Sequence, residues 1–276
     1  MTRESPLRAG TLLFSPRRES GKREASTIHA LYAGDGPIGG AADYLLGILG
    51  ALKAKVRHVL PTKPLAPALL SAHYDVIILS DFPRAQASDA AQRAIAERVA
   101  HGVGLLMVGG WASFSGPRGG WRGSRLEALL PVSCRLGDDR LQWPGGALLV
   151  PVRPHAILRG LSWSAPPAIC GLNQVRPKAG GRVLLGARAI RAQRLGSGGY
   201  RLSLTSTMHP LLVVDDRPRR RVAALTTDVA PHWCGGLVDW GVRRRRLRVS
   251  ETVTIDVGER YVHFLTALIR WLAGHA

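Results

Sequence analysis

Residues 74–110 read YDVIILSDFPRAQASDAAQRAIAERVAHGVGLLMVGG. The segment opens on a continuous apolar run, and residues 104–108 form a second one. Between the two runs, Ser88 is a suitable N-cap for an amphipathic helix, and Gly102 suits the left-handed position that ends it. Apolar strands joined by such a helix indicate a parallel sheet that is covered on both faces.

The same alternation of strands and helices continues on both sides of this segment. The pattern predicts strands over residues 30–33, 56–60 and 222–226 and helices over 45–53 and 259–273. Residues from about 118 to 217 instead contain many Gly and Pro residues and short β-like runs. We expect that stretch to be a β-rich elaboration of the sheet. The predicted organisation is a basic, flexible tail over residues 1–28 and a single domain over residues 29–276.

Composition restricts the class of protein. The chain has 276 residues, a formal net charge of +19 and 46% hydrophobic residues. No apolar run reaches the roughly 18–20 residues that a membrane helix needs, so no membrane partner is expected. Three widely separated cysteines (Cys134, Cys170 and Cys234) form neither a disulfide nor a zinc pattern. We therefore expect a cytoplasmic protein with reduced thiols, no metal and no cofactor.

The positive charge comes mainly from arginine, including a run at residues 243–246. Such an excess predicts non-specific attraction to nucleic acids. The basic runs lack interleaved aromatic residues, zinc-finger spacing and a recognition helix. Arginines spread over solvated faces are therefore the favoured interpretation, and specific nucleic-acid binding is the alternative.

Polar residues and glycines follow several of the predicted strands. In open parallel sheets, ligands bind beyond the carboxyl ends of the strands. The candidate acid–base groups there are Asp35, Asp81 and His232. The candidate ligand-binding residues are Gly36, Gly109, Gly110, Trp111, Ser113 and Asp228.

Structural interpretations of the same residues stay open. The carboxylates of Asp35 and Asp81 could cap helix N-termini, and Gly109 and Gly110 could be needed only because the chain turns sharply there. His232 could be a packed loop residue. Residues 138–140, Asp-Asp-Arg, could form a local ion-paired turn of small energetic weight.

Taken together, the motifs resemble a known family. They are YDVIILSD (74–81), GVGLLMVGGWASFSG (102–116), RLEALLPV (125–132), DDR (138–140), HAIL (155–158), RVAALTTDVAPHW (221–233) and RWLAG (270–274). In this order they resemble the bacterial glutamine amidotransferase-like family, part of the class I glutamine amidotransferase superfamily. The resemblance covers roughly residues 30–274. It implies a three-layer, flavodoxin-like α/β fold with a mostly parallel sheet.

The resemblance also implies a particular active site. A working class I amidotransferase carries a nucleophilic cysteine on the turn after a central strand, activated by a histidine and a glutamate, and backbone amides hold the oxyanion. Here the matching turn is Gly109-Gly110-Trp111-Ala112, without a cysteine. His232 stands where the histidine is expected, but Cys234 replaces the glutamate two residues later. Cys234 lies outside the turn, so adjacency to His232 is weak support for catalysis.

We expect a glutamine amidotransferase-like protein that lacks the nucleophilic cysteine. Its expected function is to bind a small-molecule ligand or to take part in assembly. A homo-oligomer is compatible with the sequence. One alternative is an enzyme of another reaction type, hydrolase-like, with acid–base groups at the strand ends. The other alternative is an arginine-rich nucleic-acid-binding protein.

Overall fold

The computed structural model describes residues 27–196 and 198–275. Nearly all of the predicted tail over residues 1–28 lies outside the described residues. The first strand begins at His29, immediately after that stretch.

The centre of the described chain is a mixed sheet of ten strands. Five strands run parallel, in the order β2–β1–β3–β4–β12: β2 (Lys55–Val59), β1 (His29–Gly34), β3 (Val76–Ser80), β4 (Gly104–Val108) and β12 (Val222–Leu225). Five further strands continue the sheet in antiparallel fashion: β11 (His209–Asp215), β9 (Arg182–Arg194), β6 (Arg140–Pro151), β7 (Ala168–Asn173) and β10 (Tyr200–Leu204). The predicted α/β fold with a β-rich elaboration is confirmed.

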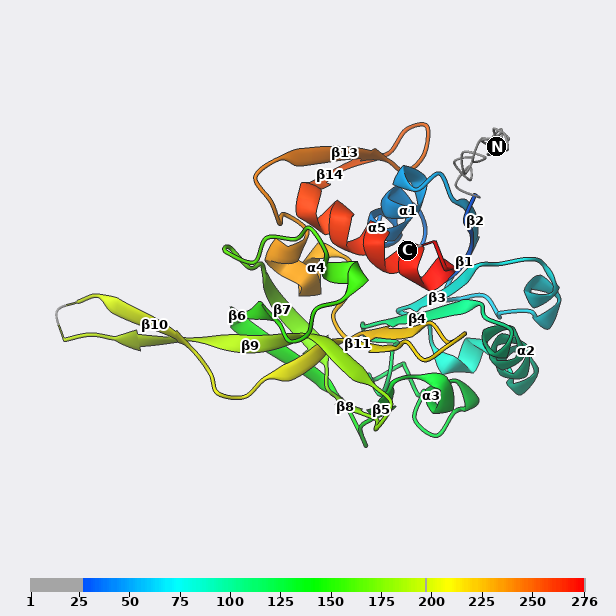
Figure 1. Ribbon diagram of the computed structural model, residues 1–276, viewed down its shortest axis with the longest axis horizontal. Coiled ribbons are helices and arrows are strands. Elements are labelled where there is room, and N and C mark those ends of the chain that lie inside the picture. Colours follow the sequence, from blue (N-terminus) through cyan, green and yellow to red (C-terminus); the bar gives the residue numbers. More distant parts are fainter. Residues whose placement is uncertain (1–26, 197, 276) are drawn as a thin grey trace, which may run out of the picture.

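Helices cover both faces of the parallel strands and so form three layers (Figure 1). On one face lie α1 (Ala42–Ala51) and α5 (Glu259–Ala273), and on the other α2 (Asp89–Ala100) and α3 (Arg125–Leu129). Successive residues of a strand point to opposite faces, so the apolar strands supply both cores. In β4, Leu106 and Val108 join the core under α5, whereas Leu105 and Met107 join the core under α2.

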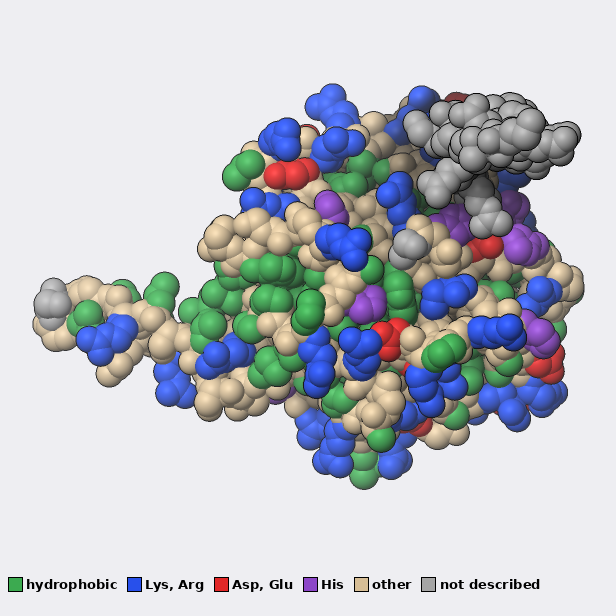
Figure 2. Space-filling model, viewed as in Figure 1, with side chains coloured by type: hydrophobic (Ala, Val, Ile, Leu, Met, Phe, Trp, Pro, Cys, Tyr) green, Lys and Arg blue, Asp and Glu red, His purple; other side chains and the backbone are tan. Residues whose placement is uncertain are grey.

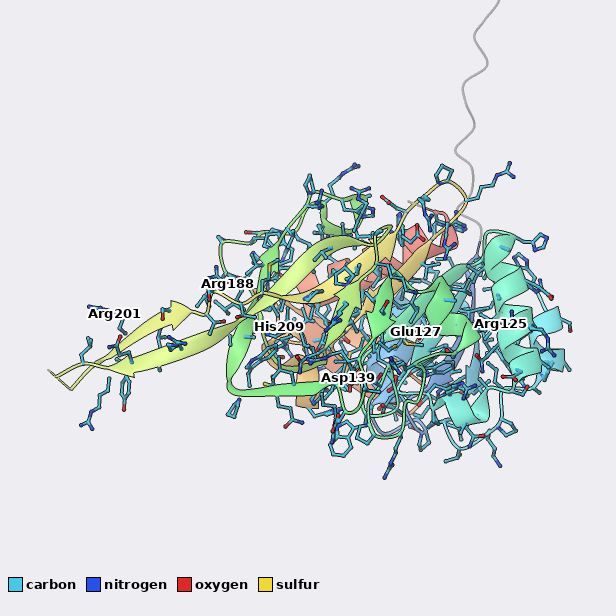
Figure 3. All side chains as sticks on the ribbon, turned by 90° about the horizontal axis from the view of Figure 1, so that it is seen from below. Arg125, Glu127, Asp139, Arg188, Arg201 and His209 are labelled. Carbon is cyan, nitrogen blue, oxygen red and sulfur yellow. The ribbon has the colours of Figure 1, made fainter. Side chains whose placement is uncertain are left out.

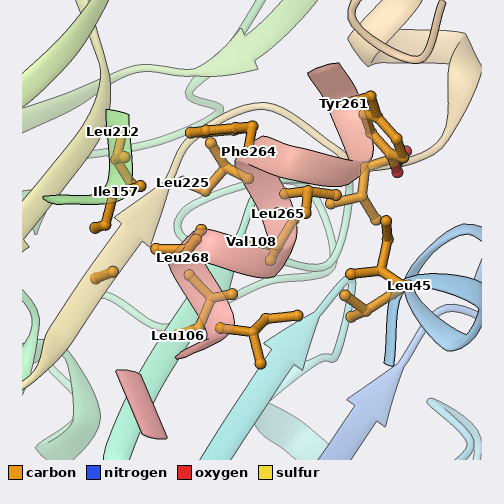
Figure 4. Packing of buried hydrophobic residues seen from close by; sticks show 14 of the residues in the cluster. Leu45, Leu106, Val108, Ile157, Leu212, Leu225, Tyr261, Phe264, Leu265 and Leu268 are labelled. Atoms are coloured by element: carbon orange, nitrogen blue, oxygen red, sulfur yellow. Dashed lines mark hydrogen bonds between the residues drawn. The ribbon is translucent and has the colours of Figure 1, made fainter. Parts of the chain in front are cut away.

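The core under α5 shows why the last helix forms. Phe264, Leu265 and Leu268 project from one face of α5 onto the sheet, where they meet Leu106 and Leu225 (Figure 4). All of these side chains are buried. Each one contributes about 1.5–3 kcal/mol relative to an exposed position, and Gly274 ends the helix in a left-handed conformation.

Two small two-stranded sheets accompany the large one. They pair β5 (Val132–Cys134) with β8 (Val175–Pro177) and β13 (Arg244–Arg248) with β14 (Thr254–Gly258). The arginine run at residues 243–246 therefore enters a strand that the sequence did not indicate. Its neighbour Leu247 is buried against α1, and Arg244 bonds to the carboxylates of Asp239 and Asp256.

Part of the antiparallel half of the sheet projects from the rest of the protein. The outer part of β9 and the whole of β10 form a two-stranded ribbon that projects beyond the rest of the sheet (Figure 1). Within the described residues, none of the helices combines the length and the apolar character needed to cross a lipid bilayer.

Candidate functional site

The carboxyl ends of β1, β3 and β12 meet at one edge of the parallel half. A cleft of about 300 Å³ opens there, lined by Asp35, Asp81, Asp228 and His232 together with residues 36–41 and Pro61. The structure thus brings together the three residues predicted as acid–base groups. Of the predicted ligand-binding residues, Gly36 and Asp228 line this cleft.

A second hollow, of about 660 Å³, is larger but chemically poorer. It lies between Pro151 and Trp163 and is lined by one histidine, His155, and no carboxylate. His155 is occupied locally, since its Nδ1 accepts a hydrogen bond from the backbone N–H of Ile157. The smaller cleft is the better candidate site because it collects titratable groups from separate strands.

Unusual backbone conformations aim two carboxylates into the cleft. Asp35 has φ 51° and Asp81 has φ 47°, left-handed values that non-glycine residues seldom adopt. The backbone N–H of Asp35 donates to the carbonyl of Ser80 at 3.0 Å, so the parallel strands β1 and β3 stay paired to their carboxyl ends. A Cβ atom at Gly34 would lie 1.5 Å from that carbonyl oxygen, so this close approach requires glycine there.

Neither carboxylate caps a helix. The N-cap of α1 is Ala41, without a side-chain cap, and the carboxylate of Asp43 accepts from the N–H of Gly39. Asp35 instead accepts a hydrogen bond from the hydroxyl of Tyr32 at 2.5 Å. The capping interpretation of Asp35 and Asp81 is therefore wrong, because Asp35 is bonded to the hydroxyl of Tyr32 and Asp81 to the N–H of Ala112 in the turn after β4.

The cleft holds carboxyl groups whose pKa values are displaced toward neutrality. Burial raises the pKa of Asp35 well above its usual range, and the neighbouring charge of Asp228 adds to the rise. Burial also raises the pKa of Asp228 to about 7, although the N–H groups of Ala230 and Val229 oppose the rise. Burial raises the pKa of Asp81 as well, against the N–H of Ala112. Closely spaced acids of this kind share protons and can donate or accept them near neutral pH.

His232 extends this acid cluster toward solvent. It lies on α4 (Pro231–Cys234), and its Nε2 is 3.1 Å from Oδ2 of Asp228, four residues earlier. The other oxygen of Asp228 accepts from the N–H groups of Val229 and Ala230, which fixes the carboxylate. The side chain of His232 is 55% exposed, so its ring is reachable from the cleft and is not a packed loop residue.

The turn after β4 is closed against side chains at both glycines. A Cβ atom at Gly109 would lie 2.1 Å from the carbonyl oxygen of Thr226. At Gly110, where φ is 155°, it would lie 2.5 Å from Oδ1 of Asp81. The N–H of Ala112 donates to that same oxygen at 2.5 Å, and the N–H of Asp81 donates to Oγ of Ser113 at 3.1 Å. The Asp81 carboxylate therefore fills the space beside the turn and accepts a hydrogen bond from one of the backbone amides of the turn.

Two residues behind this turn were missed by the sequence interpretation. Oδ1 of Asn173 accepts from the N–H of Gly110 at 2.9 Å, and its Nδ2 donates to the Gly110 carbonyl at 3.2 Å and to Oδ1 of Asp139 at 2.7 Å. Asp139 is fully buried, and its other oxygen accepts from the N–H of Ser115. Asn173 and Asp139 thus clamp the turn from the antiparallel half of the sheet.

The prediction of a local ion-paired turn at residues 138–140 is correct only in part. Asp138 and Arg140 form an exposed pair, with Nη2 and Oδ2 2.7 Å apart. Asp139 is buried and faces Asn173, because adjacent residues of an extended segment point to opposite sides. The guanidinium of Arg140 also lies 4.2 Å from the centre of the half-exposed ring of Trp111, a cation–π contact.

Gly109, Gly110, Trp111 and Ser113, predicted to bind ligand, are not among the residues that line the cleft. They form the wall behind Asp81, so any contact with a ligand stays a prediction. Among the residues that the structure describes, no three His, Cys, Asp or Glu side chains are placed to hold a metal ion.

Comparison with protein families identifies the family of this chain. Residues 54–249 match a family described as "Putative glutamine amidotransferase", GATase1_like. The chain belongs to this family. The predicted resemblance is confirmed. Comparison with curated proteins found no match.

Solved structures share the fold of this GATase1-like chain. "Cytoplasmic Protein STM1381" from Salmonella typhimurium LT2 is 22% identical over 89% of this chain and 99% of that one, with a TM-score of 0.64. "Cytoplasmic Protein STM3548" from Salmonella typhimurium is also 22% identical, over 88% and 98%, with a TM-score of 0.64. The "mmIFT52 N-terminal domain" is 12% identical over 90% and 97%, with a TM-score of 0.54. At these identities the likeness extends to the fold alone.

Proposed function

We propose that this GATase1-like protein does not hydrolyse glutamine and uses its strand-end cleft to bind a small ligand. The observation that carries the proposal is the collision between a side chain at Gly110 and the Asp81 carboxylate. In a working amidotransferase, this turn presents the nucleophile and its amides hold the oxyanion. Here neither Gly109 nor Gly110 has room for a side chain, and the N–H of Ala112 already donates to Asp81.

The cysteines of the chain support the same proposal. Cys134 and Cys234 are buried, and burial raises the pKa of both thiols well above the ordinary value, which disfavours the nucleophilic thiolate. Cys170 is exposed on β7 and is not among the residues that line the cleft. The adjacency of Cys234 to His232 in sequence is not matched by an activated thiol.

The chemistry of the cleft favours a ligand rich in hydrogen-bond donors. Three carboxyl groups and one imidazole face a volume of about 300 Å³, at the small end of ligand sites. Carboxylates accept hydrogen bonds from hydroxyl and amino groups. Sugars, polyols and small amines are therefore the ligand classes that the cleft suits best.

A glutaminase assay combined with calorimetry tests this proposal. We expect no ammonia release from glutamine and measurable heat with at least one polyol, sugar or amine. Binding should be weakened at least about tenfold by Asp35→Asn and left unchanged by the control Asp138→Asn, whose carboxylate is exposed outside the cleft. Glutamine turnover that disappears in Cys234→Ser would contradict the proposal, and so would an absence of heat with every class tested.

A second candidate function is acid–base catalysis in the same cleft. The pKa of Asp228, raised to about 7, and its contact with His232 favour it, because a general acid or base works best near the pH of the reaction. For any substrate that the protein turns over, His232→Ala should lower kcat about 100-fold or more without shifting the unfolding transition. The control is His101→Ala, at the C-cap of α2 and outside the residues that line the cleft, where no change in kcat is expected. Turnover that survives in His232→Ala excludes this role.

We also propose a cytoplasmic location. Its support is that the two Salmonella relatives are described as cytoplasmic proteins and that the three cysteines are unpaired.

A further inference from the structure

The stretch of chain that builds most of the antiparallel half of the sheet carries charge of one sign. Residues 140–214 contain ten Lys or Arg residues and no Asp or Glu. The acidic residues that border this stretch, Asp139 and Asp215, are both buried. More than half of the formal net charge of +19 therefore belongs to this continuous stretch, without compensating carboxylates inside it.

The ribbon of β9 and β10 is the part of this stretch that stands farthest from the body. The two strands pair from Ile190 opposite Leu204 to Arg194 opposite Tyr200, and β10 pairs with β9 alone. Figure 3 places Arg201 on the projecting ribbon, far from Asp139 in the body of the protein. Figure 2 shows basic and apolar side chains on the visible face of the ribbon and no acidic ones.

Within the part of the chain that the structure describes, the cations of the ribbon have no partners. Arg191, Arg194 and Arg201 are exposed. None of their guanidinium groups has a hydrogen bond or an ion pair within residues 27–196 and 198–275. Two large side chains between them are also exposed, Tyr200 at 66% and Leu202 at 69%. Exposed apolar side chains beside unpaired cations in a protruding element are typical of a binding surface.

The register distributes these side chains over both faces of the ribbon. Opposite residues of an antiparallel pair share a face, so Arg194, Tyr200 and Leu202 lie on one face. Arg191 and Arg201 lie on the other. Cations on both faces can reach phosphates on either side of a groove that the ribbon enters.

We propose that the β9–β10 ribbon binds duplex DNA by entering its major groove. The major groove of B-form DNA, about 12 Å wide, admits a two-stranded β-ribbon. Unpaired arginines supply the phosphate contacts, and apolar side chains such as Leu202 can contact thymine methyl groups. Duplex RNA is a poorer fit because its major groove is narrow and deep. A second copy of this chain would bring the same uncompensated positive charge, which disfavours self-association through the ribbon.

Anisotropy of a short fluorescent DNA duplex, measured over a salt series with the full chain, tests this proposal. The test variant is Arg191→Gln/Arg194→Gln/Arg201→Gln. The matched control is Arg243→Gln/Arg245→Gln/Arg246→Gln, which removes the same three charges from exposed side chains at the β13 hairpin. Because the altered side chains of both variants are exposed, each should keep the wild-type unfolding transition.

The ribbon variant should bind DNA at least about tenfold more weakly, and the slope of log affinity against log salt should fall by about 3. The control should keep the wild-type slope. Equal weakening in both variants would show that only net charge matters and would overturn the proposal. Duplex RNA bound as tightly as DNA, with the same loss in the ribbon variant, would exclude the groove assignment. Light scattering that shows an oligomer lost in the ribbon variant, with DNA binding intact, would assign the ribbon to self-assembly instead.

Discussion

Gly110→Ala should lower the free energy of unfolding by about 3–5 kcal/mol, a large effect for one methyl group. The added Cβ would lie 2.5 Å from Oδ1 and 2.8 Å from Cγ of Asp81, and φ is 155° at this position. The Asp81 carboxylate cannot move away freely, since it accepts the N–H of Ala112, and Gly110 itself is held on both sides by Asn173. Urea or guanidinium unfolding measures the change.

The matched control is Gly102→Ala. Gly102 also has a positive φ, 96°, but a Cβ there would meet nothing within 4 Å. Its cost should be about 1–2 kcal/mol, from the backbone conformation alone. The excess at Gly110 over Gly102 isolates the collision with Asp81. Equal costs at the two glycines would mean that the turn after β4 has room for a side chain after all.

Asp228→Asn should raise the free energy of unfolding above that of the wild type by about 2–4 kcal/mol at pH 8 and by almost nothing at pH 4. Burial raises the pKa of Asp228 to about 7 in the folded protein, above the roughly 3.9 of an unfolded aspartate. Between these values the folded state binds a proton that the unfolded state does not, so the stability of the wild type falls as pH increases. Asparagine stays neutral and does not incur this loss.

Asparagine also preserves the local contacts of Asp228. Its Oδ1 can accept from the N–H groups of Val229 and Ala230, and its amide can donate to His232. Removing the charge at 228 should also ease the ionisation of Asp35, whose pKa the Asp228 charge helps to raise. Denaturant unfolding of both proteins at several pH values measures the difference. The control Asp138→Asn, at an exposed ion pair, should show no gain at pH 8. A difference for Asp228→Asn that does not depend on pH would contradict the raised pKa.

The parallel half of the fold and part of the site could be predicted from the sequence. Apolar runs such as residues 104–108 become buried strands because nothing polar interrupts them, and each supplies both faces of the sheet. Since parallel strands end at the same edge, Asp35, Asp81 and His232 were predicted to lie together, and they line one cleft.

The support of the turn after β4 could not be predicted. Asn173 is 63 residues from Gly110 in sequence, on an antiparallel strand whose partner β6 has a register shift between Gln142 and Ala147. No local pattern sets such a register. The role of Asp139 in supporting the turn was not predicted either, because its neighbours Asp138 and Arg140 indicated a surface ion pair. The projection of the β9–β10 ribbon likewise depends on where the other strands stop pairing.

A double-mutant cycle between Gly110 and Asp81 tests the central claim most directly, namely that the Asp81 carboxylate occupies the space a nucleophile would need. Asp81→Gly removes all three atoms that a Cβ at position 110 would approach, and glycine tolerates the φ of 47° at position 81. The account predicts that Gly110→Ala costs about 2 kcal/mol or more less in the Asp81→Gly protein than in the wild type. The same cost in both backgrounds would contradict it.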